Sequence, residues 1–209
     1  MEENTAARWL HLRASMQRLA AVLRNASTAR PLSTAAVTGF VVMSAGDAAA
    51  QLTVSSASNF DGTRNLVSSS YNGLASPCFY RWYRLMDWLI PGLAVRRLVP
   101  KVLLSQLVTT GANNPCYLSW CNSVEACLGA EPVDWAAVRT KTLEQLQREL
   151  PNLYGSSMIF WLPVTGANYA LVPDHLKILF VSSCSVLWGG FVSHVAHRAA
   201  AHGAAGPGR

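Results

Sequence analysis

The segment LPNLYGSSMIFWLPVTGANYALVP, residues 150–173, decides the fold class of this chain. It carries no formal charge, because the nearest charged residues on either side are Glu149 and Asp174. A helix needs about 20 such residues to cross roughly 30 Å of hydrocarbon. The run is therefore long enough to span a membrane.

The composition of the whole chain favours the same class. Charged residues make up 13% of the sequence, against roughly 25% in an average soluble domain. Mean hydropathy is only +0.20, because small polar residues are frequent inside the apolar runs, where they let membrane helices pack closely. The 209 residues are a single-domain length, so we expect one membrane domain.

Other apolar runs flank the deciding segment. They cover Ser33–Val54, Leu66–Tyr83, Val102–Val124 and residues 178–193. Residues 55–70 are expected to form a loop, and Trp135–Leu150 an amphipathic helix within a polar connector. We predict an all-α, multi-span integral membrane helical bundle.

The number of spans stays open between two arrangements. Residues 150–173 and 178–193 are separated only by Asp174–Lys177, so they can form a tight hairpin that gives about five spans. If one of them is re-entrant, as the prolines within residues 150–173 allow, about four spans remain.

Three regions are expected along the chain: residues 1–30, a transmembrane domain over 31–198, and a flexible tail over 199–209. The first region is arginine-rich and amphipathic. That pattern is typical of a mitochondrial targeting helix, although Glu2 and Glu3 oppose it, and equally of a helix lying on the membrane surface. We expect the N-terminus and the basic residues 92–101 to share one side of the membrane.

Sequence landmarks recur in four blocks in a fixed order. The last block contains Trp161, Asn168, Pro173, Trp188 and Ser193, and the earlier blocks contain Gly46, Asp47, Gln51, Trp82, Tyr83, Lys101 and Gln106. Over about residues 16–198 the chain resembles the Mpv-seventeen family, also called the twenty-two-kilodalton peroxisomal membrane protein family.

The resemblance implies a mitochondrial inner-membrane protein, with the peroxisomal membrane as the second possibility. It also implies a pore-like or metabolite-permeability role in mitochondrial homeostasis. Several polar family positions differ here, including Ser105, Thr165 and Lys177. This dilution equally suits a second hypothesis, a non-catalytic accessory subunit of a large membrane assembly such as a respiratory complex.

The candidate site residues are polar groups expected at membrane depth. Asp47 is the sharpest anomaly, because an ionised carboxylate there costs about 2.5–3.5 kcal/mol on insertion scales. It is expected either to line a polar path or to lock helices through an ion pair. Its candidate partners are Arg64, Arg81, Arg84, Lys101 and Lys177. Gln51, Gln106 and Asn168 are expected chiefly to bridge helices, at about 0.6 kcal/mol each, with solute binding as the alternative.

Other function classes lack sequence support. No nucleotide-binding loop, nucleophile elbow or metal-spaced histidine motif occurs, so we expect neither enzyme activity nor a cofactor. Net charge is +6 without dense basic runs, which favours anionic lipid headgroups over nucleic acid as the partner. The tryptophans are expected to form an interfacial belt, and the cysteines to be reduced. Either a homo-oligomer or a larger complex is expected.

Overall fold

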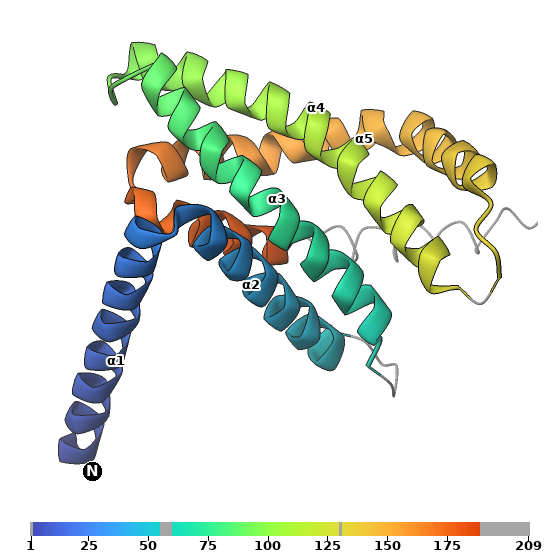
Figure 1. The fold of residues 1–209 in the computed structure, drawn as a ribbon. Coiled ribbons are helices and arrows are strands. Elements are labelled where there is room, and N and C mark those ends of the chain that lie inside the picture. Colours follow the sequence, from blue (N-terminus) through green and yellow to red (C-terminus); the bar gives the residue numbers. More distant parts are fainter. Residues whose placement is uncertain (1, 55–59, 130, 189–209) are drawn as a thin grey trace, which may run out of the picture.

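The computed structural model describes residues 2–54, 60–129 and 131–188, and every element in them is helical (Figure 1). The helices are α1 Glu2–Ala29, α2 Pro31–Val54, α3 Gly62–Leu89, α4 Val95–Leu128 and α5 Trp135–Ala170. A short 3-10 helix, η1 Asp174–Leu176, follows, and residues 177–188 are helical again. The predicted all-α class is confirmed.

Helices α2 to α5 form an antiparallel bundle, with residues 177–188 folded back along it (Figure 1). The closest packing is between α2 and α3 and between α4 and α5. Small residues permit the first contact: a Cβ at Gly39 would lie 2.7 Å from the carbonyl oxygen of Asn72 and would collide with Ser76. Gly46 allows a similar approach to Val186. This is the small-residue packing expected of membrane helices.

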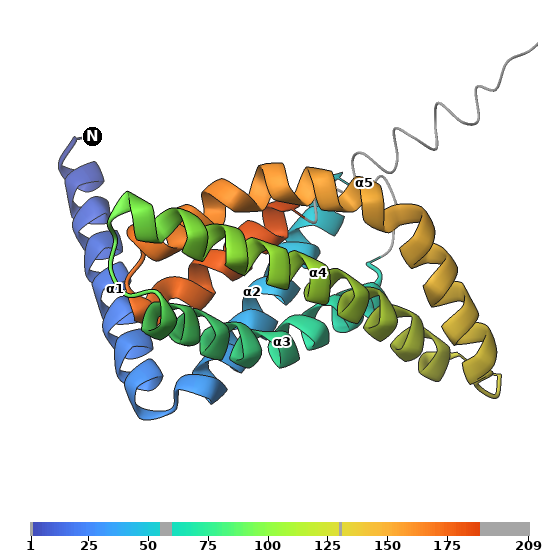
Figure 2. The ribbon, with the colours of Figure 1, turned by 90° about the horizontal axis from the view of Figure 1, so that it is seen from above.

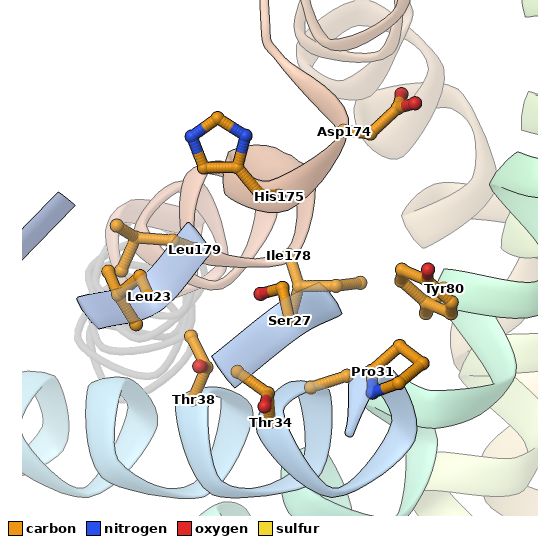
Figure 3. A pocket seen from close by; sticks show the side chains of 11 residues that line it. Leu23, Ser27, Pro31, Thr34, Thr38, Tyr80, Asp174, His175, Ile178 and Leu179 are labelled. Atoms are coloured by element: carbon orange, nitrogen blue, oxygen red, sulfur yellow. The ribbon is translucent and has the colours of Figure 1, made fainter. Parts of the chain in front are cut away.

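Helix α1 lies across one end of the bundle instead of joining it (Figure 2). Figure 3 shows the seam where its last turns meet α2, α3 and η1, around Leu23, Ser27, Ile178 and Leu179. The space left there is about 10 Å³, which holds at most about one water. The side chains at this seam therefore pack together and hold α1 in place. The turn between α3 and α4 lies at the same end of the bundle.

Several predicted boundaries were wrong. Helix α3 begins at Gly62, inside the predicted loop 55–70, because Asp61 caps it by accepting a hydrogen bond from the backbone of Arg64 at 2.9 Å. Helix α5 runs through residue 150 without a break, so the predicted amphipathic helix and the deciding segment are one element. Residues 55–59 and 189–209, with Ser193 and the predicted tail, lie outside the described residues.

Among the described residues, one helix is both long enough and apolar enough to cross a membrane. It covers Pro31–Leu52 with a mean hydropathy of 1.3, and it corresponds to the predicted first span. The remaining predicted runs lie on α3, α4, α5 and residues 177–188. The number of spans stays a prediction.

Candidate functional site

A cavity of about 430 Å³ opens inside the bundle between α2, α3, α4, α5 and residues 177–188. Its wall combines apolar side chains with hydroxyl and amide groups, which include those of Tyr71, Asn72, Gln106, Thr109, Thr110, Asn113, Asn114, Tyr117, Ser157 and Thr165. The volume is in the range of small-molecule sites. Among the residues predicted from sequence, Gly46, Asp47, Gln106, Tyr83, Trp161 and Trp188 line it.

Asp47 lies on the cavity wall with only 6% of its side chain exposed. One carboxylate oxygen is 3.1 Å from Nη2 of Arg64. The other accepts hydrogen bonds from Gln51 at 2.8 Å and from Asn65 at 3.3 Å. Of the candidate partners left open by the sequence, Arg64 is therefore the one that pairs with Asp47. Arg64 therefore compensates the negative charge of this buried acid.

Gln51 holds the end of α2 against the start of α3. Its amide nitrogen donates to the carbonyl oxygen of Asp61 at 3.0 Å, and its amide oxygen accepts from the Asp61 backbone nitrogen at 2.7 Å. Because Asp61 also caps α3 next to Arg64, Gln51 positions the ion pair. Asn65, which the sequence analysis missed, joins the same network through Asp47 and is itself held by two hydrogen bonds with Ser44, each at 2.8 Å.

Gln106 ties α4 to α5 at the deeper part of the cavity. Its side-chain oxygen accepts a hydrogen bond from Thr165 at 3.2 Å, and its nitrogen donates to Thr110. The hydroxyls of Ser105 and Tyr169 make a second contact between the same helices at 2.7 Å. Ser105 also accepts from the indole nitrogen of Trp82 at 3.2 Å. Gln106 thus occupies the helix-bridging position that the sequence suggested for it.

Asn168 does not bridge helices in this structure. Asn168 is fully buried, and among the described residues neither polar atom of its amide has a hydrogen-bond partner.

A cluster of two buried lysines and two partly exposed acids lies beyond the deep end of the cavity. Asp87 accepts hydrogen bonds from Lys101 and from Lys177, each at 2.7 Å, and Lys177 also pairs with Asp174 at 2.8 Å. The ammonium groups of the two lysines lie 4.9 and 5.5 Å from the centre of the Tyr169 ring. Both lysines are paired here, so neither is a partner of Asp47.

Two tyrosines separate this cluster from the cavity. Tyr83 lines the cavity, and the ring of Tyr169 packs edge-on against it with centroids 5.6 Å apart. The lysines lie over Tyr169. The order from the cavity outward is thus Tyr83, Tyr169 and then the ions.

Asp87 and Lys177 stay ionised near neutral pH. Burial raises the pKa of Asp87, but the hydrogen bonds from Lys101 and Lys177 outweigh it and leave the pKa below its ordinary value. Burial lowers the pKa of Lys177, yet its bonds to Asp174 and Asp87 raise it overall. Both groups lie outside the charge-free runs of the sequence. Their charged forms therefore stabilise one another.

Four of the seven tryptophans fall into two groups. Trp88 and Trp135 are exposed, as expected of an interfacial belt. Trp161 and Trp188 instead line the cavity and pack with Phe160, with ring centroids between 5.1 and 6.4 Å apart. These two family landmarks, far apart in sequence, form one aromatic wall.

Asp87 is the central residue that the sequence analysis did not select. One signal was available, because Asp87 is the only acid between Asp61 and Glu125. An isolated acid at the end of an apolar run needs a basic partner. Lys101 and Lys177 were instead considered for Asp47, since spacing alone does not show which acid a distant lysine reaches.

Comparison with known proteins places the chain in a family. The sequence profile of the Mpv17 / PMP22 family matches residues 138–193. The mitochondrial inner membrane protein Mpv17 of Bos taurus is 31% identical over 84% of this chain and 96% of its own length. Its counterpart in Homo sapiens is 32% identical over 60% of this chain and 66% of its own length.

A relative with a different name is also similar. PXMP2/4 family protein 2 of Dictyostelium discoideum is 26% identical over 64% of this chain and 62% of its own length. No solved structure matches the chain. The profile match and the Bos taurus relative, which the chain covers almost end to end, together show that this chain belongs to the Mpv17 / PMP22 family of membrane proteins.

Proposed function

We propose that this chain forms a passage for small polar solutes across the mitochondrial inner membrane. The observation that carries the proposal is the cavity of about 430 Å³ with its hydroxyl and amide wall. Polar groups of this kind replace the hydration shell of a solute as it leaves water. The names of the relatives from Bos taurus and Homo sapiens support this membrane, because they describe a mitochondrial inner membrane protein. The peroxisomal membrane is the alternative, since one relative carries the PXMP2/4 name.

The cavity offers a route that is open at one end and closed at the other. Arg64 and Glu125 line it and are exposed, so its wall reaches the surface near them. At the other end, Tyr83 and Tyr169 separate it from the cluster around Asp87. Passage through the bundle then requires the tyrosine pair to separate, and the cluster resists this because it joins α3, α4 and Lys177.

The chain acts in this proposal without catalysis and without a cofactor. Its partners are lipids with anionic headgroups. The exposed arginines at the α1 end of the bundle would contact these headgroups. Each basic side chain near an anionic surface contributes about 1 kcal/mol. Assembly as a homo-oligomer fits a passage that runs within each bundle.

A second candidate function rests on α1. This helix extends away from the bundle and meets it only near its end (Figures 1 and 2). Such an arm is suited to docking against another subunit. It favours the alternative of a non-catalytic accessory subunit in a large membrane assembly.

Two measurements separate these functions. Purified chain in proteoliposomes should admit a small neutral polyol faster than empty vesicles do, and equal rates would contradict the passage. Native electrophoresis of gently extracted membranes, with mass spectrometry of the band, gives the assembly. A small homo-oligomer supports the passage, whereas fixed stoichiometry inside a large complex supports the accessory subunit.

A further inference from the structure

The cavity wall carries its formal charges at one end. Asp47, Arg64 and Glu125 are the charged residues among the described lining, and all other lining side chains are uncharged. Asp47 belongs to α2, Arg64 to the first turn of α3, and Glu125 to the last turns of α4. Every solute that enters from this end meets these groups.

The three charges differ in how far water screens them. The side chain of Asp47 is 6% exposed, whereas those of Glu125 and its neighbour Lys141 are more than half exposed and lie 3.9 Å apart. Exposed charges are largely screened by solvent and salt, but buried ones are not. The field inside the cavity is therefore set mainly by Asp47 and by whatever neutralises it.

Arg64 is the group that neutralises Asp47. Gln51 and Asn65 satisfy the carboxylate with hydrogen bonds but add no charge. Arg64 adds one positive charge at 3.1 Å, and its own side chain is 45% exposed, so it lies between the buried acid and the solvent. Without Arg64 the wall would carry an unpaired negative charge, and without Asp47 an unpaired positive one.

We infer that Arg64 and Asp47 together set the charge selectivity of the cavity, which takes uncharged polyhydroxylated solutes in preference to ions. This inference rests on the proposed passage. The lining chemistry agrees with it, because the hydroxyl and amide groups of Thr109, Thr110 and Asn114 both donate and accept hydrogen bonds. Such groups match sugar-alcohol hydroxyls without favouring either sign of charge.

The size of the effect follows from Coulomb's law. One unpaired charge on the wall, acting on an ion about 7 Å away at an effective dielectric constant near 20, changes the ion's occupancy by tenfold or more. Removing Arg64 should therefore make the cavity favour cations, and removing Asp47 should make it favour anions. Removing both charged side chains should restore the wild-type ratio of cation to anion permeability.

The experiment uses the full chain in planar bilayers and proteoliposomes. Reversal potentials in a potassium chloride gradient give the cation-to-anion permeability ratio, and vesicle swelling gives the flux of a neutral sugar alcohol. Arg64→Gln should raise the ratio roughly tenfold. Asp47→Asn should lower it by a smaller factor, because the Arg64 left behind is 45% exposed and partly screened. The double variant should return to the wild-type ratio with sugar-alcohol flux retained.

Two further variants guard against a change that only disturbs folding. Arg64→Lys keeps the charge and should keep the wild-type ratio. Glu125→Gln removes an exposed charge of the same wall and should change the ratio much less than Arg64→Gln does. An unchanged ratio in both single variants would overturn the role of the pair. Absence of any flux, in wild type as well, would overturn the proposed passage and this inference with it.

Discussion

Asp87 joins two lysines that are far apart in sequence: Lys101 Nζ and Lys177 Nζ each lie 2.7 Å from one of its carboxylate oxygens. The contact links the end of α3 to the first turns of α4 and to the start of the helical residues 177–188. Lys101 is 1% exposed. A buried lysine at this depth is tolerated because Asp87 compensates its charge.

Asp87→Asn should destabilise the bundle. The variant leaves Lys101 buried without a full counter-charge, and breaking a buried pair typically costs about 3–5 kcal/mol. We expect a loss at or below the lower end, about 2–3 kcal/mol, because part of Asp87 reaches solvent. Thermal unfolding in detergent measures it. Glu125→Gln, which removes the exposed partner of Lys141, serves as the control and should change the midpoint little.

Stability should depend on pH through the same cluster. Asp87 has a lowered pKa, so its contribution is present above its ordinary value of 3.8 and is lost as pH falls through the lower folded value. Lys177 has a raised pKa, so its contribution is present below 10.5 and is lost as pH rises through the higher folded value. Unfolding midpoints should thus be level between these limits. When the pH falls below 3.8, the unfolding midpoint of the wild type should drop further than that of Asp87→Asn. An equal drop in both proteins would contradict this prediction.

Gly39→Ala should destabilise the contact between α2 and α3. The new Cβ would lie 2.7 Å from the Asn72 carbonyl oxygen and would collide with Ser76, so the helices must separate. Gly111→Ala is the matched control, because a Cβ there meets nothing within 4 Å. Alanine should stabilise α4 at that position by up to about 1 kcal/mol through helix propensity. Midpoints that shift in the same direction for both variants would contradict the packing argument.

The turn between α3 and α4 should bind anionic lipid. Arg81, Arg84, Arg96 and Arg97 are exposed around it, and so are the apolar side chains of Trp88 and Val95. Replacing these arginines with glutamine removes positive charge worth about 1 kcal/mol per side chain at an anionic surface. Native mass spectrometry should show fewer anionic lipids retained on this variant. Arg139→Gln with Lys141→Gln, on α5, should leave lipid retention unchanged.

The sequence by itself determined the class of this protein. Charge-poor runs long enough for a bilayer predict membrane helices, because unpaired backbone groups are too costly in lipid for other structures. The fixed order of landmarks around Trp161 and Trp188 identified the family. Asp47 was selected as a site residue because a lone acid in an apolar run needs a partner, a local requirement that periodicity and composition reveal.

Only the tertiary structure decided which charges meet. Arg64 reaches Asp47 because the cap at Asp61 starts α3 within the predicted loop, and Gln51 holds that cap in place. Lys177 reaches Asp87 because the chain turns at η1 and returns along the bundle. Pairing of distant residues depends on the packing of whole helices, which glycine contacts such as that of Gly39 set. The physical reason is that these forces act over short distances in space, while a sequence records only distances along the chain.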